Sequence, residues 1–171
     1  VIEALIDGES PQAALAGAGL QAEEALIAVC SELAATDKLL AQDHELEAML
    51  KALQAEMPHE DLVYLGDTAR LPYGTKSKTS ISRYAGQATA LLQERGIKLL
   101  VVACNTASAV ALEALEQQMR PVPVIGVVEP GATAAVAARP GGRHLVLATE
   151  ATVQYGAYRQ AIAQRDKQAE V

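Results

Sequence analysis

The clearest candidate for a catalytic residue lies in residues 101–115, VVACNTASAVALEAL, where an apolar run leads directly into a helical pattern. Cys104 stands at the junction, so we expect it at the carboxyl end of a strand and before the first turn of a helix. The positive end of a helix dipole favours thiolate over thiol. Asn105 or Thr106 can cap this helix, and the backbone N–H groups there can receive a carboxylate. A thiolate in that place is a suitable base for an acidic C–H. The alternative is a cysteine buried for packing alone.

Two further segments carry candidate binding groups. In DTARLPYGTKS, residues 67–77, we expect Pro72, Tyr73 and Gly74 to form a turn. Gly74 permits close approach of a backbone, and the Tyr73 hydroxyl can bond a ligand, although an ordinary solvated loop would have the same composition. Thr149, in TEAT, is a candidate donor to a bound carboxylate; the alternative is that Thr149 or its neighbour Thr152 is a plain helix N-cap.

The elements around these residues predict an α/β fold. Buried strands are expected at DLVYLG, LLVVAC, VPVIGVV and HLVLAT, and helical patterns at Ser77–Arg95, Thr106–Gln118, Pro130–Ala138 and Ala151–Gln164. Strands that alternate with helices indicate βαβ units and an open parallel sheet. Ligands of such sheets bind beyond the carboxyl ends of the strands, where the candidate residues are expected to lie.

The first third of the chain has a different pattern. Apolar positions in residues 20–42 and 44–57 follow helical spacing, so we expect a helical segment over 1–57 with no strand in it. Cys30 would then lie on an apolar helix face. The remainder divides into 58–121, a first α/β half, and 122–171, the start of a second.

Composition limits the class of partner. The net charge is −7 without a long basic run, which argues against nucleic acid and anionic membranes. No apolar stretch approaches the roughly 20 residues of a membrane span, and the acidic start lacks the basic region of a signal peptide. With only two cysteines, Cys30 and Cys104, a disulfide framework is not expected, and we predict a cytoplasmic protein. No His, Cys and Asp spacing predicts a metal site, and no glycine-rich phosphate loop is present.

Four segments together resemble the glutamate racemase family, a close relative of aspartate racemases. They are YLGDTARLPYGTKS, LVVACNTASAVALEAL, VPVIGVVEPGA and LATEATVQYGAY, in the family's order, and the resemblance covers about residues 49–171. The resemblance implies a racemase without cofactor or metal, in which one cysteine thiolate removes the α-proton of glutamate and a second thiol protonates the opposite face. The product, D-glutamate, serves peptidoglycan synthesis, and family members commonly pair as homodimers.

The resemblance also implies roles for single residues. Cys104 matches the first catalytic cysteine, and Tyr73 and Gly74, with Pro72 beside them, match a substrate-holding loop. Asn105 and Thr106 match contacts to the substrate amino and carboxylate groups, and Thr149 matches a further carboxylate contact.

Two motifs of the family are missing from the sequence. The family's first strand ends in Asp-Ser-Gly, and its second cysteine lies in Gly-Cys-Thr-His; neither occurs here. One cysteine can only return a proton to the face from which it came, so the isolated chain is expected to exchange the α-proton at most. Two alternatives stay open: a non-catalytic α/β binding or scaffold module, and a racemase of the same superfamily that acts on another amino acid.

Overall fold

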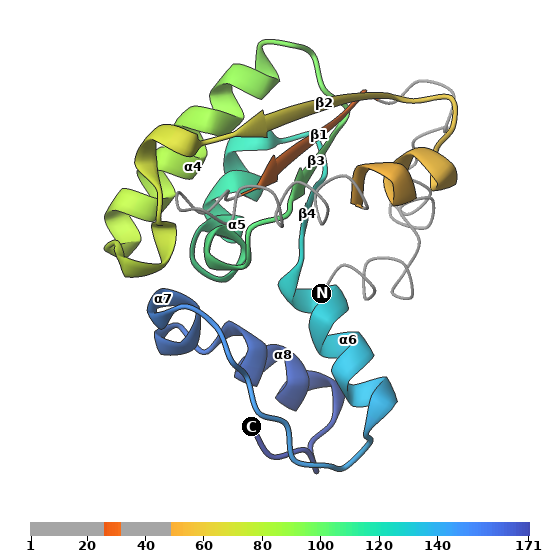
Figure 1. Cartoon of the computed structure of the whole chain (residues 1–171), viewed down its shortest axis with the longest axis vertical. Coiled ribbons are helices and arrows are strands. Elements are labelled where there is room, and N and C mark those ends of the chain that lie inside the picture. Colours follow the sequence, from red (N-terminus) through yellow and green to blue (C-terminus); the bar gives the residue numbers. More distant parts are fainter. Residues whose placement is uncertain (1–25, 32–48) are drawn as a thin grey trace.

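The computed structural model describes residues 26–31 and 49–171, and its centre is a parallel four-stranded sheet (Figure 1). The strands are β1 (Leu26–Ser31), β2 (Asp61–Gly66), β3 (Leu99–Val102) and β4 (Val124–Gly126). Their order is β2-β1-β3-β4, with every neighbouring pair parallel. The expected open parallel sheet of an α/β fold is therefore confirmed, and three of the four strands lie where the apolar runs predicted them.

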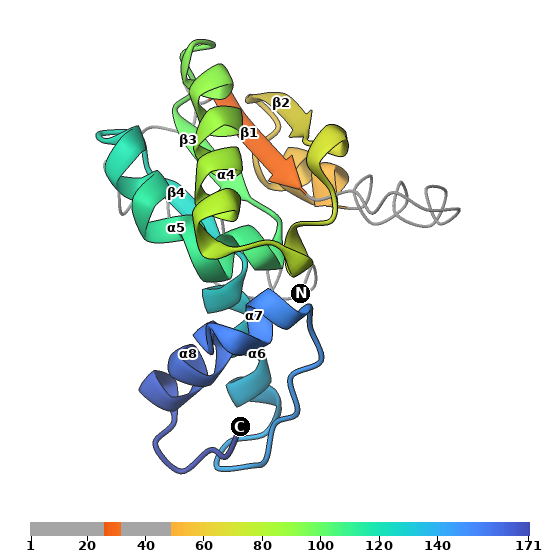
Figure 2. The ribbon, with the colours of Figure 1, turned by 90° about the vertical axis from the view of Figure 1, so that its left-hand side faces the viewer.

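Helices cover both faces of this sheet (Figure 2). On one face lie α4 (Lys78–Gln93) and α5 (Asn105–Met119), packed in a cluster with Leu100 and Val102 of β3. On the other face, a helix over residues 49–56 packs its buried side chains against Leu99 and Val101. Because β3 alternates its side chains between the two clusters, it is buried on both faces, as a continuous apolar strand predicts.

The ends of α4 follow from local chemistry. Ser77 is the N-cap, and its hydroxyl accepts the backbone N–H of Ser80 at 3.3 Å. The turn after the helix ends at Gly96, whose φ of +70° lies in the left-handed region that glycine adopts without strain. The expected helix over Ser77–Arg95 is confirmed with these limits.

The remaining helices form a second layer below the sheet (Figure 1). They are α6 (Val128–Ala138), α7 (Glu150–Gln154) and α8 (Ala157–Arg165). Helices α6 and α8 pack through a small buried cluster and through Arg165, which pairs with Glu129. The single helix expected over Ala151–Gln164 is instead two helices, because Gly156 adopts a φ of +62° between them.

The prediction that residues 1–57 contain no strand is wrong. Residues Leu26–Ser31 form β1, which pairs with β2 and β3 and stands inside the sheet. The six residues LIAVCS are a short apolar run, and such a run suits a helix face and a buried strand equally well. This run is a strand because β2 and β3, which come later in the chain, pair with it on both sides. The other predictions for residues 1–25 and 32–48 lie outside the described residues.

The strand expected at HLVLAT is also absent. Residues 144–149 are extended but belong to no strand, and the only pairing nearby is a single bridge between Arg143 and Glu170. Leu145 and Leu147 are 84% and 86% exposed. A strand exists only through pairing with a neighbour, and within the described residues this segment has no sheet to join.

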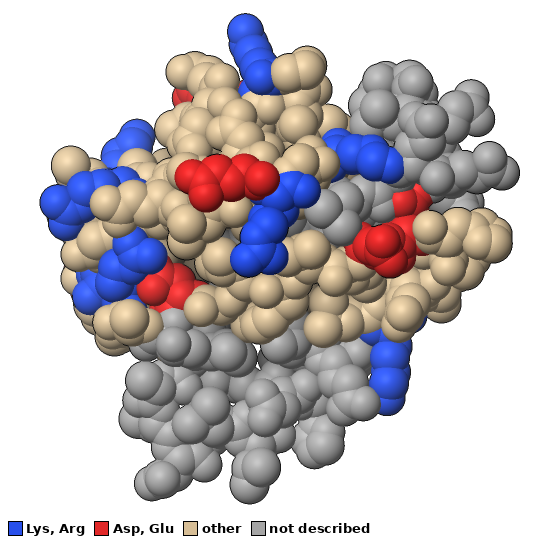
Figure 3. Space-filling model, turned by 90° about the horizontal axis from the view of Figure 1, so that it is seen from above, with Lys and Arg blue, Asp and Glu red and all other residues tan. Residues whose placement is uncertain are grey.

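One face of the molecule carries side chains of both charges (Figure 3). Seen from above, acidic and basic side chains are interspersed over the described part of the face (Figure 3). Among the described residues, no helix is both long and apolar enough to cross a bilayer.

Candidate functional site

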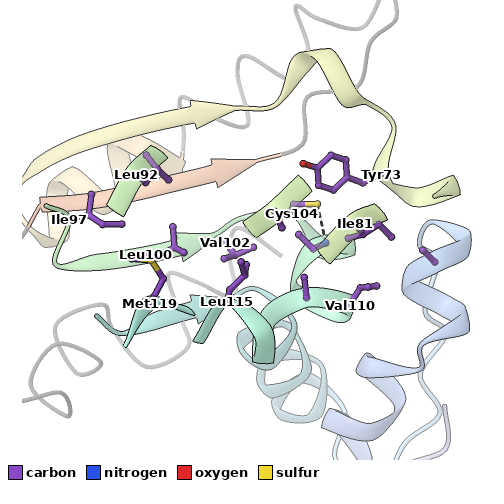
Figure 4. Packing of buried hydrophobic residues seen from close by; sticks show 14 residues of the cluster. Tyr73, Ile81, Leu92, Ile97, Leu100, Val102, Cys104, Val110, Leu115 and Met119 are labelled. Carbon is purple, nitrogen blue, oxygen red and sulfur yellow. Dashed lines mark hydrogen bonds between the residues drawn. The ribbon is translucent and has the colours of Figure 1, made fainter. Parts of the chain in front are cut away.

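Cys104 lies where the sequence placed it, two residues beyond β3 and directly before α5. It is 5% exposed and belongs to the cluster between the sheet and α4 and α5 (Figure 4). Its sulfur accepts the backbone N–H of Ala107 at 3.3 Å, so Cys104 itself is the N-cap of α5. The expectation that Asn105 or Thr106 caps this helix is therefore wrong. A sulfur acceptor at this position faces the positive end of the α5 dipole, which favours the thiolate, whereas burial in an apolar cluster opposes it.

Tyr73 comes from the loop after β2, which contains the short 3-10 turns η2 (Thr68–Arg70) and η3 (Tyr73–Thr75). Its ring is buried in the same cluster as Cys104 (Figure 4). Its hydroxyl donates to Oδ2 of Asp67 at 2.5 Å. The hydroxyl that the sequence offered to a ligand is thus engaged by a carboxylate of the protein. Pro72 precedes Tyr73 as the N-cap of η3 and is exposed.

Asp67 is a buried carboxylate that the sequence reasoning did not single out. It follows β2 directly and is 7% exposed. Besides Tyr73, the Arg70 guanidinium contacts it, with Nε 2.8 Å from Oδ2. The signal was present in the sequence, since an acidic residue after a buried strand falls at the sheet edge where ligands bind.

Three threonine hydroxyls join the two layers of the molecule. Oγ1 of Thr149 lies 2.9 Å from Oγ1 of Thr106 and 3.0 Å from Oγ1 of Thr152. Gly74 packs directly on this group, because a Cβ added there would stand 2.4 Å from Cβ of Thr149. The fold therefore brings three predicted residues, Gly74, Thr106 and Thr149, from three separate segments to one place.

Asn105, the first residue of α5, has a partner that no sequence motif indicated. The Tyr158 hydroxyl, from α8, donates to Oδ1 of Asn105 at 2.6 Å. Burial raises the pKa of Tyr158 above its ordinary value of 10.0, so the donor keeps its proton at neutral pH. The residues are 53 positions apart, and only the packing of α8 near the start of α5 joins them.

A cavity of about 640 Å³ opens beside these groups. Its lining includes Asn105, Thr149, Thr152 and Tyr158, and the extended residues 143–149 form one side. Cys104 is not part of the wall, so the cavity reaches the start of α5 but not the buried sulfur. Across the described ranges 26–31 and 49–171, no group of three or more His, Cys, Asp and Glu side chains could hold a metal ion.

Sequence comparison connects this arrangement to known proteins. The Asp/Glu/Hydantoin racemase family model matches residues 38–171. A glutamate racemase of Geobacter metallireducens is 50% identical over 123 residues, which are 72% of this chain and 45% of the relative. A glutamate racemase of Aquifex aeolicus is 49% identical over 114 residues, covering 67% and 44%. The chain thus spans about half the length of the curated relatives it matches.

Solved structures agree with the sequence matches. Glutamate racemase of Francisella tularensis, in complex with D-glutamate, superposes with a TM-score of 0.68 at 31% identity, over 87% of this chain and 52% of that one. Glutamate racemase from Aquifex pyrophilus gives a TM-score of 0.67 at 37% identity, over 84% and 53%. The family model covers well over half of the chain, and the structural likeness includes the parallel sheet and its helices. The chain belongs to the Asp/Glu/Hydantoin racemase family.

Proposed function

We propose that this chain carries the proton-transfer half of a glutamate racemase, with Cys104 as the base. The observation that supports it most is the position of the Cys104 sulfur, which accepts a backbone N–H as the N-cap of α5 at the carboxyl end of β3. Charge on the sulfur is favoured there by the hydrogen bond and by the helix dipole. Relatives named glutamate racemase, one of them solved with D-glutamate, point to glutamate as substrate.

The chemical step is a proton transfer between carbon and sulfur. The Cys104 thiolate takes the α-proton, the C–H bond breaks, its electron pair stays on the α-carbon, and an S–H bond forms. The same thiol can return the proton, or a solvent proton after exchange, to the face from which it came. Inversion requires a second acid on the opposite face, as the family resemblance implies.

The polar groups near the start of α5 suit a substrate with two carboxylates. Backbone N–H groups at the start of α5 and the hydroxyls of Thr106, Thr149 and Thr152 are donors of the kind that stabilise developing negative charge. Asn105 adds a side-chain amide. Tyr73 and Gly74 act through the backbone of their loop in this proposal, since the Tyr73 hydroxyl is held by Asp67. Pro72 contributes to the shape of the same loop.

The proposal also covers the cofactor requirement, the cellular location and the assembly of the enzyme. The reaction needs neither cofactor nor metal, it occurs in the cytoplasm, and its product D-glutamate serves peptidoglycan and cell-wall synthesis. The two α/β halves divide near residue 121, and the working unit is a homodimer.

The experiment is proton NMR of L- and D-glutamate in heavy water with the purified chain, together with chiral analysis of the product. We expect loss of the α-proton signal that depends on Cys104. Loss without inversion would indicate same-face exchange by Cys104 alone. Loss with inversion would indicate a second acid, with Cys30 or a partner chain as the first to be tested. Retention of the signal with both enantiomers, in a folded protein, would reject the proposal.

A further inference from the structure

The Asn105 amide is fixed by a residue from the other layer of the molecule. Its carbonyl oxygen Oδ1 accepts the Tyr158 hydroxyl at 2.6 Å, a short bond in a partly buried place. Its amide nitrogen Nδ2 donates no hydrogen bond within the described residues. The carbonyl end therefore faces α8, and the NH₂ end is left for another group.

Tyr158 is itself held in place by close packing. A Cβ added at Gly131 of α6 would stand 3.0 Å from both Cε1 and the hydroxyl oxygen of Tyr158. That distance is tighter than ordinary packing, so a side chain at this position would require the ring to shift by a few tenths of an ångström. Gly131 thus lets the ring lie against α6 with its hydroxyl directed to the start of α5.

The direction of the hydrogen bond has chemical consequences. In this bond the Tyr158 hydroxyl is the donor and the Asn105 carbonyl is the acceptor, so the bond uses the carbonyl end of the amide and not its NH₂ end. An amide held in this way keeps two N–H donors, and Asn105 lines the cavity together with Tyr158. N–H donors match a carboxylate, whereas an ammonium group needs an acceptor.

We propose that Tyr158 is a positioning residue that orients the Asn105 amide so that its NH₂ group donates to a substrate carboxylate rather than contacting the amino group. This rests on the proposed function for the identity of the substrate. The orientation itself is a property of the chain without ligand.

The experiment uses the ¹⁵N-labelled full chain and two ligands, D-glutamate and glutarate, which keeps both carboxylates but lacks the amino group. The Asn105 NH₂ signal is assigned by its loss in Asn105→Ala. In the wild type we expect both ligands to shift this signal. In Tyr158→Phe we expect the Asn105 NH₂ signal of the ligand-free protein to move or broaden, because the amide can rotate. We also expect the Kd for D-glutamate to rise about five- to tenfold, which corresponds to the loss of roughly one hydrogen bond.

Two variants separate positioning from general structural damage. Gly131→Ala, which displaces the ring without removing the hydroxyl, should weaken binding in the same direction. Tyr155→Phe removes the hydroxyl of a neighbouring half-buried tyrosine and should change neither the Asn105 signal nor the Kd. Tyr158→Phe combined with Asn105→Ala should bind no more weakly than Asn105→Ala alone, because both act through one amide.

The outcomes distinguish this inference from the proposed function. An Asn105 signal and a Kd unchanged in Tyr158→Phe would overturn the positioning role. A signal shifted by D-glutamate but not by glutarate would overturn the carboxylate assignment in favour of the amino group. If the wild type binds neither enantiomer of glutamate, the proposed function fails; the inference then survives only if glutarate shifts the Asn105 signal in the wild type and not in Tyr158→Phe.

Discussion

Replacing Cys104 by serine and by alanine separates the chemical role of this side chain from its structural one. The Cys104 sulfur is the N-cap acceptor for Ala107 N–H, at 3.3 Å, in a place that is 5% exposed. Serine is among the preferred N-cap residues, so Cys104→Ser should keep the cap and change the free energy of unfolding by less than about 0.5 kcal/mol. Alanine has no acceptor. Loss of the cap and of one buried heavy atom should cost about 1–2 kcal/mol, which lowers Tm by roughly 2–8 °C in a chain of this size.

The two variants should behave alike in catalysis. A serine hydroxyl is a far weaker acid than a thiol, so neither serine nor alanine supplies a base at neutral pH, and both should abolish exchange of the glutamate α-proton in heavy water. The assays are thermal unfolding followed by circular dichroism, and proton NMR of glutamate. Exchange that survives in Cys104→Ser would remove Cys104 from its proposed role. Equal Tm values for the serine and alanine variants would show that the sulfur does not stabilise the start of α5.

Three further perturbations test the packing around the site. Gly74→Ala would force a methyl group against the side chain at the N-cap of α7, 2.4 Å away, and should lower the free energy of unfolding by about 1–3 kcal/mol in chemical denaturation. As a control, Gly86→Ala meets only the tip of a flexible glutamine and should be neutral or stabilising. Equal effects of the two variants would contradict the close packing of the loop on α7. The raised pKa of Tyr158 means that the folded state holds the phenol proton more tightly, so the contribution of this group to stability is fully present below pH 10 and is lost as pH rises through the raised pKa. A Tyr158→Phe variant should therefore lose less stability at alkaline pH. An identical slope of stability against pH would contradict the buried phenol. Replacing both Leu145 and Leu147 by lysine should leave stability within about 0.5 kcal/mol and reduce self-association in light scattering, because both side chains are exposed; a large loss of stability would show that they are buried in solution.

The sequence determined the parts of the fold that are set by local chemistry. The strands β2, β3 and β4 follow from short apolar runs, and the start of α4 follows from the hydroxyl of Ser77. The placement of Cys104 at a strand-to-helix junction follows in the same way. These features depend on neighbours in the chain, so their signal is contained within a few residues.

The tertiary structure decided whatever depends on distant partners. β1 is a strand because β2 and β3 flank it, although its residues also fit a helix face. Residues 144–149 have the composition of a strand, but with no sheet to pair with inside the described part of the chain they stay extended, and Leu145 and Leu147 are exposed. Apolar runs specify burial, and pairing alone makes them strands.

The site shows the same division. Its residue types were visible in the sequence, whereas their partners were not. The sequence predicted that the Tyr73 hydroxyl can bind a ligand, whereas in the structure this hydroxyl donates to Asp67. The bond between Tyr158 and Asn105 spans 53 positions, and no pattern within either segment announces it. Local sequence sets the chemistry that a side chain can perform. The packing of α5 with elements far along the chain sets which atoms of the side chain remain available, because a group that is hydrogen-bonded within the protein is not free to bind a ligand.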